Sequence, residues 1–320
     1  MNRDLRPAAL GLALSLVLLP TIGRAADDEP TFTRKADVVY GRKFGTALTL
    51  DIFTPKKDAN GLGIIWVVSG GWFSSHDAIN PEPPFVKPLL DRGYTVFAVV
   101  HGSQPKFTIP EVLTDMNRAI RFIRHNAKDY GIDPERLGIF GGSAGGHLSL
   151  MQGTAGDLGK ADSKDAVDRT SSRVQAVACF FPPTDFLNYG KPGENAIGRG
   201  TLKGFQAPFD FHEADKATGR FERITDEAKI TEIGEQISPI THVSSDDPPT
   251  LIIHGDADKL VPIQQAELIV EKFKKANVEA KLVSKPGAVH GWPNIHQDVL
   301  QFVDWFDEHL KKSKDSNSKP

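Results

Sequence analysis

A serine framed by glycines follows a short apolar run near the middle of the chain. Residues 137–140 are apolar, and residues 141–147 read Gly-Gly-Ser-Ala-Gly-Gly-His. A strand, a tight turn and a helix in this order are typical of a nucleophile elbow, in which the serine hydroxyl stands at the apex of the turn. Glycines suit such a turn because residues without Cβ let strand and helix approach closely. The pattern predicts that Ser143 is a nucleophile.

Two later segments contain the groups that would activate a serine. A hydroxyl is a weak nucleophile at neutral pH, so it needs a histidine base and a carboxylate that orients this base. Residues 254–262 read His-Gly-Asp-Ala-Asp-Lys-Leu-Val-Pro, and residues 287–292 read Gly-Ala-Val-His-Gly-Trp. The chain order Ser, Asp, His is expected when these groups lie on successive strand ends of one sheet. Ser143, Asp258 and His290 supply that order.

Alternating strands and helices are expected to position these groups. Apolar runs predict strands at residues 62–68, 94–100, 137–140, 174–181, 250–254 and 280–283, after a hairpin of residues 37–40 and 47–53. Helices are predicted at residues 82–92, 110–130, 147–152, 262–276 and 293–311. Continuously apolar strands between helices indicate an α/β fold with a mainly parallel sheet covered on both faces. In such sheets the chemistry lies at the carboxyl ends of the strands.

Residues 184–247 differ in character from the rest. Gly, Lys, Asp, Glu and scattered Phe replace the long apolar runs, and short helices are expected, for example at residues 225–233. Insertions of this length are usually lids or binding loops, so we expect a cap over the site. Phe205, Phe209 and Phe211 could contact the substrate or anchor the insertion to the rest of the protein.

Composition restricts the class of protein. The 320 residues are 39% hydrophobic and 25% charged, which permits the core of one large α/β domain. The formal net charge is -3 without a long block of like charge, so neither a nucleic acid nor a membrane surface is an expected partner. A small-molecule or carbohydrate-linked substrate fits better. The single cysteine, Cys179, lies in an apolar run and is expected to be a buried thiol.

The first 25 residues have the pattern of a secretory signal peptide. Arg3 and Arg6 precede an apolar stretch at residues 8–19, and small residues follow up to Ala25. An uncleaved anchor is the alternative, but the apolar stretch is shorter than the about 20 residues that span a bilayer. We therefore expect export to the periplasm or the medium, with cleavage after Ala25. The polar tail at residues 312–320 is expected to be disordered.

The elbow and the two later segments together resemble the α/β-hydrolases of the esterase and lipase kind. The resemblance is to the bacterial acetyl-esterase and feruloyl-esterase branch related to the prolyl oligopeptidase catalytic domain, and it covers residues 36–311. It implies a mostly parallel eight-stranded sheet with a cap inserted at about residues 184–247. It also implies that the second aspartate of residues 254–262, Asp258, is the triad acid. Asp256 then shapes a turn, and Asp185 remains an alternative acid.

His290 competes with nine other histidines for the role of base, and four of them lie near strand ends or the elbow. His76 and His101 lie in loops near strand ends, His147 follows the elbow, and His254 ends a strand. The resemblance implies a structural role for His254. Only His290 has the position after the last strand from which a base can reach the nucleophile.

A second glycine turn, residues 68–72, reads Val-Ser-Gly-Gly-Trp. Backbone N–H groups at glycine turns suit an oxyanion hole, so Gly70, Gly71 and the residue after the nucleophile, Ala144, are the expected donors. The related esterases have a histidine before these glycines, where it braces the loop. That histidine is absent here and Ser69 precedes the glycines, which leaves the rigidity of the turn open.

Trp72 and Trp292 flank the predicted catalytic turns, and either could line the substrate pocket or only pack. No metal or organic cofactor is implied, because the chain has no His or Cys cluster at ligand spacing and no phosphate-loop lysine. We expect an exported serine carboxylesterase acting on small-acyl or carbohydrate-linked esters. The alternatives are a peptidase of the prolyl oligopeptidase type and a non-catalytic binding protein on the same fold.

Overall fold

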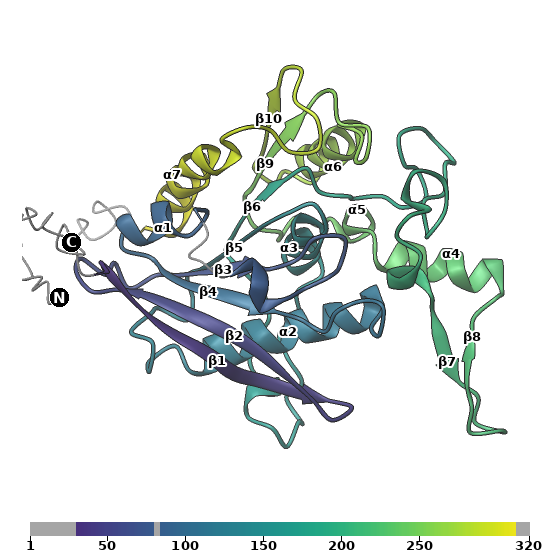
Figure 1. The fold of residues 1–320 in the computed structure, drawn as a ribbon, viewed down its shortest axis with the longest axis horizontal. Coiled ribbons are helices and arrows are strands. Elements are labelled where there is room, and N and C mark those ends of the chain that lie inside the picture. Colours follow the sequence, from purple (N-terminus) through teal and green to yellow (C-terminus); the bar gives the residue numbers. More distant parts are fainter. Residues whose placement is uncertain (1–29, 80–83, 312–320) are drawn as a thin grey trace, which may run out of the picture. The chain divides into compact units, whose positions relative to one another are not determined.

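The computed structural model describes residues 30–79 and 84–311, and the predicted signal peptide and polar tail lie outside these residues. Contacts divide the chain into residues 1–30 and residues 31–320, and the second unit contains all the described strands and helices. Its main sheet has eight strands in the order β1-β2-β4-β3-β5-β6-β9-β10 (Figure 1). Strands β1 and β2 form an antiparallel hairpin, β2 is antiparallel to β4, and the remaining pairs are parallel. The predicted fold class is confirmed.

The predicted strands and helices are present, most with ends shifted by a few residues. The helix predicted at residues 82–92 begins at Lys87, the one predicted at 110–130 ends at His125, and the one predicted at 293–311 begins at Val299. Residues 82 and 83 of the first of these lie outside the described residues. The strands of the main sheet are β1 (Phe32–Lys43), β2 (Thr46–Pro55), β3 (Gly63–Val67), β4 (Thr95–Val100), β5 (Leu137–Gly142), β6 (Ala176–Phe180), β9 (Thr250–Gly255) and β10 (Ala280–Lys285). The helices around it are α1 (Lys87–Asp91), α2 (Ile109–His125), α3 (Ala144–Thr154), α6 (Gln264–Lys275) and α7 (Val299–Leu310). The first strand begins earlier than predicted, because the polar residues at its start pair with the end of β2.

Helices cover both faces of the sheet. Helices α1 and α7 lie on one face, and α2, α3 and α6 lie on the other (Figure 1). Side chains of a strand point alternately to the two faces. Along β3, Ile64 and Trp66 join the core under α7, whereas Ile65 and Val67 join the core under α2 and α3. Two buried faces explain why these strands are apolar at successive positions, and Cys179 in β6 is buried as expected.

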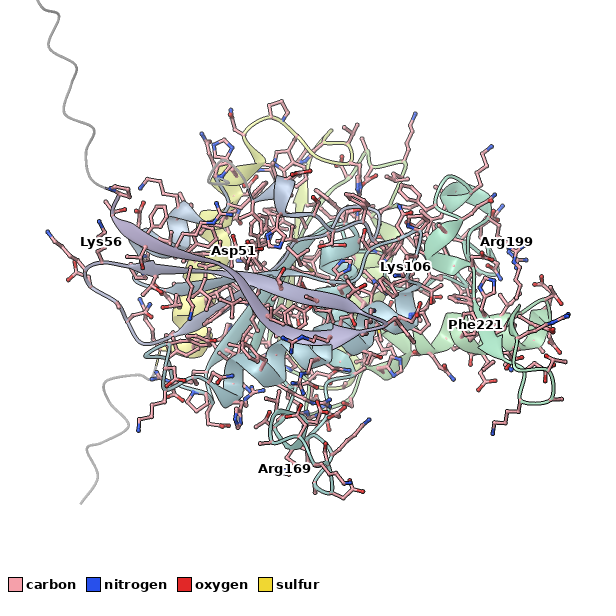
Figure 2. All side chains as sticks on the ribbon, turned by 60° about the horizontal axis from the view of Figure 1, so that its bottom comes forward. Asp51, Lys56, Lys106, Arg169, Arg199 and Phe221 are labelled. Atoms are coloured by element: carbon pink, nitrogen blue, oxygen red, sulfur yellow. The ribbon has the colours of Figure 1, made fainter. Side chains whose placement is uncertain are left out.

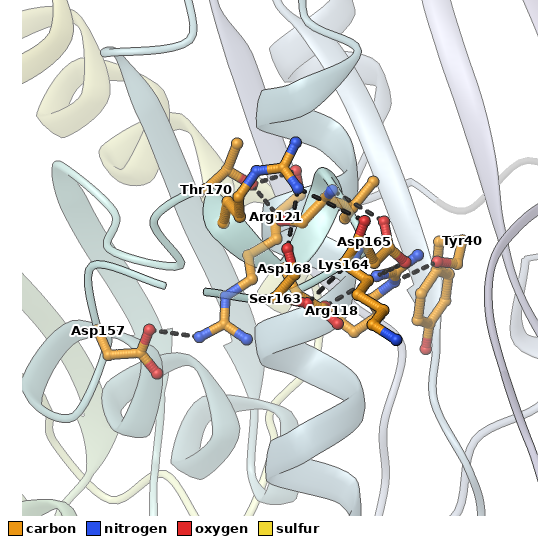
Figure 3. Close-up of polar contacts among 11 residues, drawn as sticks. Tyr40, Arg118, Arg121, Asp157, Ser163, Lys164, Asp165, Asp168 and Thr170 are labelled. Carbon is orange, nitrogen blue, oxygen red and sulfur yellow. Dashed lines mark hydrogen bonds and ion pairs between the residues drawn. The ribbon is translucent and has the colours of Figure 1, made fainter. Parts of the chain in front are cut away.

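Helix α2 is anchored to its neighbours by two arginines (Figure 3). Arg118 donates to the carbonyl of Tyr40 at 3.0 Å and to the carboxylates of Asp165 and Asp168 at 2.7 and 2.8 Å. Arg121 forms an ion pair with Asp157. These contacts join α2 to β1 and to the connection between α3 and β6, which the sequence patterns do not predict.

The predicted insertion contains helices α4 (Glu227–Gln236) and α5 (Pro239–His242) and a separate hairpin of β7 (His212–Ala214) and β8 (Phe221–Arg223). It projects away from the main sheet (Figure 1), and Arg199 and Phe221 lie on it (Figure 2). Helix α4 overlaps the helix predicted at residues 225–233. Asp226 caps its N-terminus, because the carboxylate accepts from the backbone N–H groups of Ala228 and Lys229. Within residues 30–79 and 84–311, no helix combines the length and the apolar character that crossing a bilayer requires.

Candidate active site

Ser143 occupies a strained turn between β5 and α3. Its φ of 54° lies in the left-handed region, which a residue with a side chain rarely adopts. The surrounding glycines allow this turn, because a Cβ on Gly141 would stand 2.5 Å from the carbonyl carbon of Gly145. A Cβ on Gly146 would stand 3.0 Å from the Phe180 carbonyl oxygen. The glycines of the predicted elbow are therefore required by the close packing of backbone around Ser143.

Three residues far apart in the sequence meet at the carboxyl ends of the strands. His290 Nε2 lies 2.9 Å from Ser143 Oγ, and His290 Nδ1 lies 2.7 Å from Asp258 Oδ2. Asp258 follows β9 and His290 follows β10, so neighbouring parallel strands deliver the carboxylate and the imidazole side by side. The structure brings together all three residues that the sequence assigns to a triad.

The surroundings of Asp258 keep it ionised. Burial raises the pKa of this carboxyl, but the nearby His254 ring and the hydrogen bonds from His290 and the backbone N–H of Val261 outweigh the burial and hold the pKa below its usual range. Its Oδ1 accepts from the N–H groups of Leu260 and Val261 at 2.9 and 3.0 Å. One oxygen is thus anchored by backbone, and the other is left to face His290.

The two alternative aspartates have other partners. Asp256 Oδ1 accepts from the backbone N–H of Gly287 at 2.6 Å, which ties together the turns after β9 and β10. Asp185 accepts from the backbone N–H groups of Leu187 and Asn188 at 3.0 Å. Because both ring nitrogens of His290 are already engaged by Ser143 and Asp258, neither alternative orients this histidine.

The rival histidines are held elsewhere. His147 and His101 are buried, and burial lowers the pKa of each to about 4. His254 Nε2 donates to the Val261 carbonyl at 2.8 Å and lies behind Asp258. His76 Nε2 lies 2.7 Å from Thr49 Oγ1, beside the β1–β2 hairpin. None of these rings occupies the position next to Ser143 that His290 fills.

Gly70, one of the three expected oxyanion donors, has its backbone N–H engaged elsewhere, so this expectation was wrong. The backbone N–H of Gly70 donates to the Phe73 carbonyl at 3.0 Å, and the N–H of Phe73 donates back at 2.9 Å. Gly70 is therefore occupied in closing the turn. The N–H of Gly71 forms no hydrogen bond within the described residues, and Ala144 is the first residue of α3, where an N–H has no partner in its own helix. Gly71 and Ala144 remain as candidate donors.

This turn packs closely against the start of α3. A Cβ on Gly145 would stand 2.9 Å from the Val67 carbonyl oxygen and 3.2 Å from that of Ser69. Gly71 itself has φ of 55°, and a Cβ there would stand 2.6 Å from the Phe205 ring. The close approach places the start of this turn beside Gly145, two residues after the nucleophile.

A cavity of about 470 Å³ opens beside Ser143. Its wall is mostly apolar and includes Trp66, Phe73, Phe85, Phe140, Phe180, Phe181 and Ile295. These residues come from both sheet and loops, so sequence patterns do not assemble them, although Phe180 and Phe181 are recognisable at a predicted strand end. Phe73, which directly follows the glycine turn, is 52% exposed and forms part of the rim.

The aromatic residues singled out in the sequence are mainly packing residues. Trp72 is buried, and its ring centroid lies 5.3 Å from that of Phe209 in the insertion. Phe209 and Phe211 are buried, so they anchor the insertion. Trp292 packs against Phe180 and Phe181 and donates from Nε1 to Asp298 at 2.7 Å. Trp292 thus supports the cavity wall from behind.

Two groups of described side chains are near enough to one another to share a metal ion, and neither contains a residue of the site. They are Asp37, Asp51 and His76, and Glu279, Glu308 and His309. In the first group, however, Asp51 accepts from Arg34 Nε at 2.8 Å and from the backbone N–H of Asp37 at 3.0 Å. The arginine already neutralises the buried carboxylate that a cation would need.

The sheet order, the elbow after β5 and the later acid and histidine loops define an α/β-hydrolase fold. The model of the BD-FAE family matches residues 50–273, which is more than half of the chain. The chain therefore belongs to the BD-FAE family, in the esterase branch of the α/β-hydrolases.

Similarity to individual esterases supports this assignment. A solved structure described as a truncated form of carbohydrate esterase from gut microbiota is 30% identical, with a TM-score of 0.71 over 89% of this chain and 99% of that chain. Two proteins of Mycobacterium tuberculosis are similar in sequence. The probable carboxylic ester hydrolase LipM is 26% identical over 77% of this chain and 53% of its own length. The esterase LipQ is 28% identical over 80% of this chain and 57% of its own length. The chain spans about half the length of these curated relatives.

Proposed function

We propose that this protein is a serine carboxylesterase that hydrolyses carboxylic esters through an acyl-enzyme. The observation that carries the proposal is the continuous hydrogen-bonded chain from Ser143 through His290 to Asp258, at 2.9 and 2.7 Å. The esterase names of its relatives support the same reaction.

In the first half of the reaction, Ser143 Oγ attacks the ester carbonyl carbon while His290 Nε2 takes the hydroxyl proton. Asp258 keeps the remaining ring proton on Nδ1 and stabilises the imidazolium that forms. The N–H groups of Gly71 and Ala144 donate to the oxyanion of the tetrahedral intermediate. His290 then gives its proton to the leaving alcohol, and the acyl group stays on Ser143.

In the second half, water replaces the alcohol. His290 takes a proton from the water as the oxygen attacks the acyl carbonyl, and the same donors hold the oxyanion. Collapse of this intermediate returns the proton to Ser143 and releases the carboxylic acid. One base and one pair of donors serve both halves, so the proposed site needs no additional group.

For the substrate we propose a small-molecule or carbohydrate-linked ester. Support for this class comes from the similar solved structure, which is described as a carbohydrate esterase, and from the cavity beside Ser143. A panel of p-nitrophenyl esters of increasing acyl length, followed by acetylated xylan and methyl ferulate, would identify the preferred acyl group. Preference for long-chain acyl groups and no turnover of either carbohydrate-related ester would refute the substrate class.

The reaction class can be tested with p-nitrophenyl acetate and an organophosphonate. We expect turnover, and we expect one phosphonyl group on Ser143 by mass spectrometry. The variant Ser143→Ala should lose both. Cleavage of a peptide anilide faster than of any ester would favour a peptidase, and absence of both turnover and label would favour a binding protein.

We also propose that the protein is exported with removal of residues 1–25. Support comes from the order of basic, apolar and small residues at the N-terminus. Expression of the full chain in a Gram-negative host, followed by fractionation and N-terminal sequencing, should find periplasmic protein that begins at Ala26. An intact N-terminus in the cytosolic fraction would contradict export.

A further inference from the structure

The oxyanion turn, defined as residues 69–72, needs support that the family motif does not provide here. The histidine that braces the turn in related esterases is absent, and the turn contains two successive residues with positive φ, Gly71 at 55° and Trp72 at 60°. A donor aimed at an oxyanion must be held to within a fraction of an ångström to be effective. Something else must therefore hold the N–H of Gly71.

The first support precedes Gly71. Ser69 Oγ lies 2.8 Å from His101 Nε2, and His101 Nδ1 lies 2.6 Å from the carbonyl oxygen of Gly102. Since a carbonyl oxygen only accepts, the ring proton is on Nδ1, and Nε2 accepts the hydroxyl proton of Ser69. His101 follows β4, the neighbour of the strand that leads into the turn, and it is 3% exposed.

The second support follows Gly71. The Trp72 indole N–H donates to His147 Nδ1 at 3.1 Å, and His147 Nε2 donates to the Ile237 carbonyl oxygen at 2.7 Å. His147 lies on the first turn of α3, and its backbone N–H donates to the carbonyl of Ser143 at 2.9 Å. Its side chain is completely buried. The imidazole thus connects the turn to the helix of the nucleophile and to the insertion.

The two histidines have the same arrangement. Each presents one bare ring nitrogen to a donor of the oxyanion turn, and each donates its ring proton to a backbone carbonyl that fixes the tautomer. Burial lowers the pKa of both rings to about 4, so both are neutral acceptors at neutral pH.

We propose that His101 and His147 are positioning residues that clamp the oxyanion turn, by accepting hydrogen bonds from Ser69 and Trp72 on either side of Gly71. Neither imidazole touches the substrate. The clamp replaces the missing brace of the family motif and sets the N–H of Gly71 against that of Ala144. The inference rests on the proposed esterase function, because only a reaction with an oxyanion makes the position of this N–H important.

The test removes single donor groups from the turn. Ser69→Ala deletes only the hydroxyl, and Trp72→Phe deletes the indole N–H with part of the ring. On the acceptor side, His101→Gln keeps an oxygen near the position of Nε2, whereas His101→Leu has no acceptor. His125→Gln, an exposed histidine at the C-terminal end of α2, serves as the matched control.

Three quantities are measured for each variant of the full chain: kcat and KM with p-nitrophenyl acetate, the inhibition constant of phenylboronic acid, and the fraction of active sites titrated by the phosphonate. We expect Ser69→Ala and Trp72→Phe to lower kcat per titrated site about tenfold or more, with KM changed less than about twofold. Boronic acid binding should weaken in parallel, because the tetrahedral boronate occupies the oxyanion hole. His101→Gln should retain more activity than His101→Leu.

A merely structural role would give a different result. It would lower the melting temperature and the titrated fraction and leave kcat per titrated site intact. The clamp is refuted if Ser69→Ala and Trp72→Phe keep both kcat and boronic acid affinity within about twofold of wild type. The double variant Ser69→Ala/His101→Leu should lower kcat per titrated site little more than His101→Leu alone, since either change already removes the hydrogen bond between Ser69 and His101.

Failure of this inference differs from failure of the proposed function. If the wild-type protein neither turns over an ester nor is labelled at Ser143, the esterase proposal fails. If the wild type is active and the turn variants equal it, only the clamp fails. Should His101→Leu not fold, Ser69→Ala and Trp72→Phe still decide the question, because they leave both buried histidines in place.

Discussion

At the scale of single residues, backbone geometry decides which of two nearby aspartates, Asp256 or Asp258, faces the imidazole of His290. Asp258 turns one oxygen to the N–H groups of Leu260 and Val261 and the other to His290. Asp256 instead ties down Gly287. Both carboxylates are used as hydrogen-bond acceptors, but only one of them faces an imidazole.

This difference predicts opposite outcomes for two matched substitutions. Asp258→Asn should lower kcat by about a thousandfold or more, because an amide cannot hold His290 in the required tautomer or stabilise the imidazolium. Asp256→Asn should change kcat less than about fivefold, since an amide oxygen still accepts from Gly287. Steady-state kinetics with p-nitrophenyl acetate measure both effects. Comparable losses in the two variants would show that the acid has been assigned wrongly.

At the scale of elements, the elbow and the insertion depend on close packing of different kinds. The β5–α3 turn requires the absence of side chains, because backbone atoms lie where a Cβ of Gly141 would be. The insertion requires large side chains, because Phe209 fills the space beside Trp72 and Phe186, and the buried Phe211 packs against Phe209. Each element can be tested with a matched substitution nearby.

For the elbow, Gly141→Ala should lower the free energy of unfolding by about 1–3 kcal/mol, since the added methyl group must displace the backbone of Gly145. Gly70→Ala is the control, because a Cβ at Gly70 would meet nothing within 4 Å and the residue has no positive φ. Its free energy of unfolding should change by less than about 0.5 kcal/mol. Urea unfolding followed by circular dichroism gives both values. Equal stability of the two variants would contradict the packing seen at the elbow.

For the insertion, Phe209→Ala should lower the free energy of unfolding by about 3–5 kcal/mol, because a buried ring is lost and a cavity remains. Phe221→Ala, in the hairpin of the same insertion, removes a ring that is 69% exposed and should have little effect. Limited proteolysis should cut residues 184–247 faster in the first variant than in the second. If Phe209→Ala changed only KM, Phe209 would be a substrate contact rather than an anchor.

At the scale of the whole molecule, the two neutral histidines of the proposed clamp make stability depend on pH. Each has a pKa of about 4 in the folded protein, against about 6.5 for a free histidine. Between these values the unfolded chain binds more protons than the folded one, so stability is lost as the pH falls from about 6.5 to about 4. The difference corresponds to about 3 kcal/mol for each ring.

Urea unfolding at pH 7, 5 and 4 should show this loss, together with contributions from other groups. The variant His101→Gln removes one of the two rings, so its stability should fall by about 3 kcal/mol less than that of wild type over the same range. An unchanged pH dependence in this variant would mean that His101 is not a buried neutral ring. His125→Gln keeps both buried rings, so it should retain the loss of stability attributed to His101 and His147.

Much of this molecule follows from its sequence alone. The continuously apolar strands, the amphipathic pattern of α2 and the glycine-framed Ser143 predict the parallel sheet, its covering helices and the elbow. The order of Ser143, Asp258 and His290 predicts which residues meet. The sheet, the helices and the elbow follow from local patterns, because a strand face, a helix face or a tight turn is determined by residues within a few positions of one another. The assignment of Asp258 and His290 to Ser143 follows instead from the order of the motifs along the chain and from the resemblance to the esterases.

Only the tertiary structure decided which polar groups are free and which are occupied. In the folded chain the backbone N–H of Gly70 donates to Phe73, whereas the N–H of Gly71 forms no hydrogen bond within the described residues. Ser69 forms a hydrogen bond with His101, which lies 32 positions later in the sequence. The fold likewise gathers the apolar cavity wall from separate strands and loops. Such contacts depend on which strand ends become neighbours in the sheet and on how closely backbones pack there. Local sequence patterns do not contain that information.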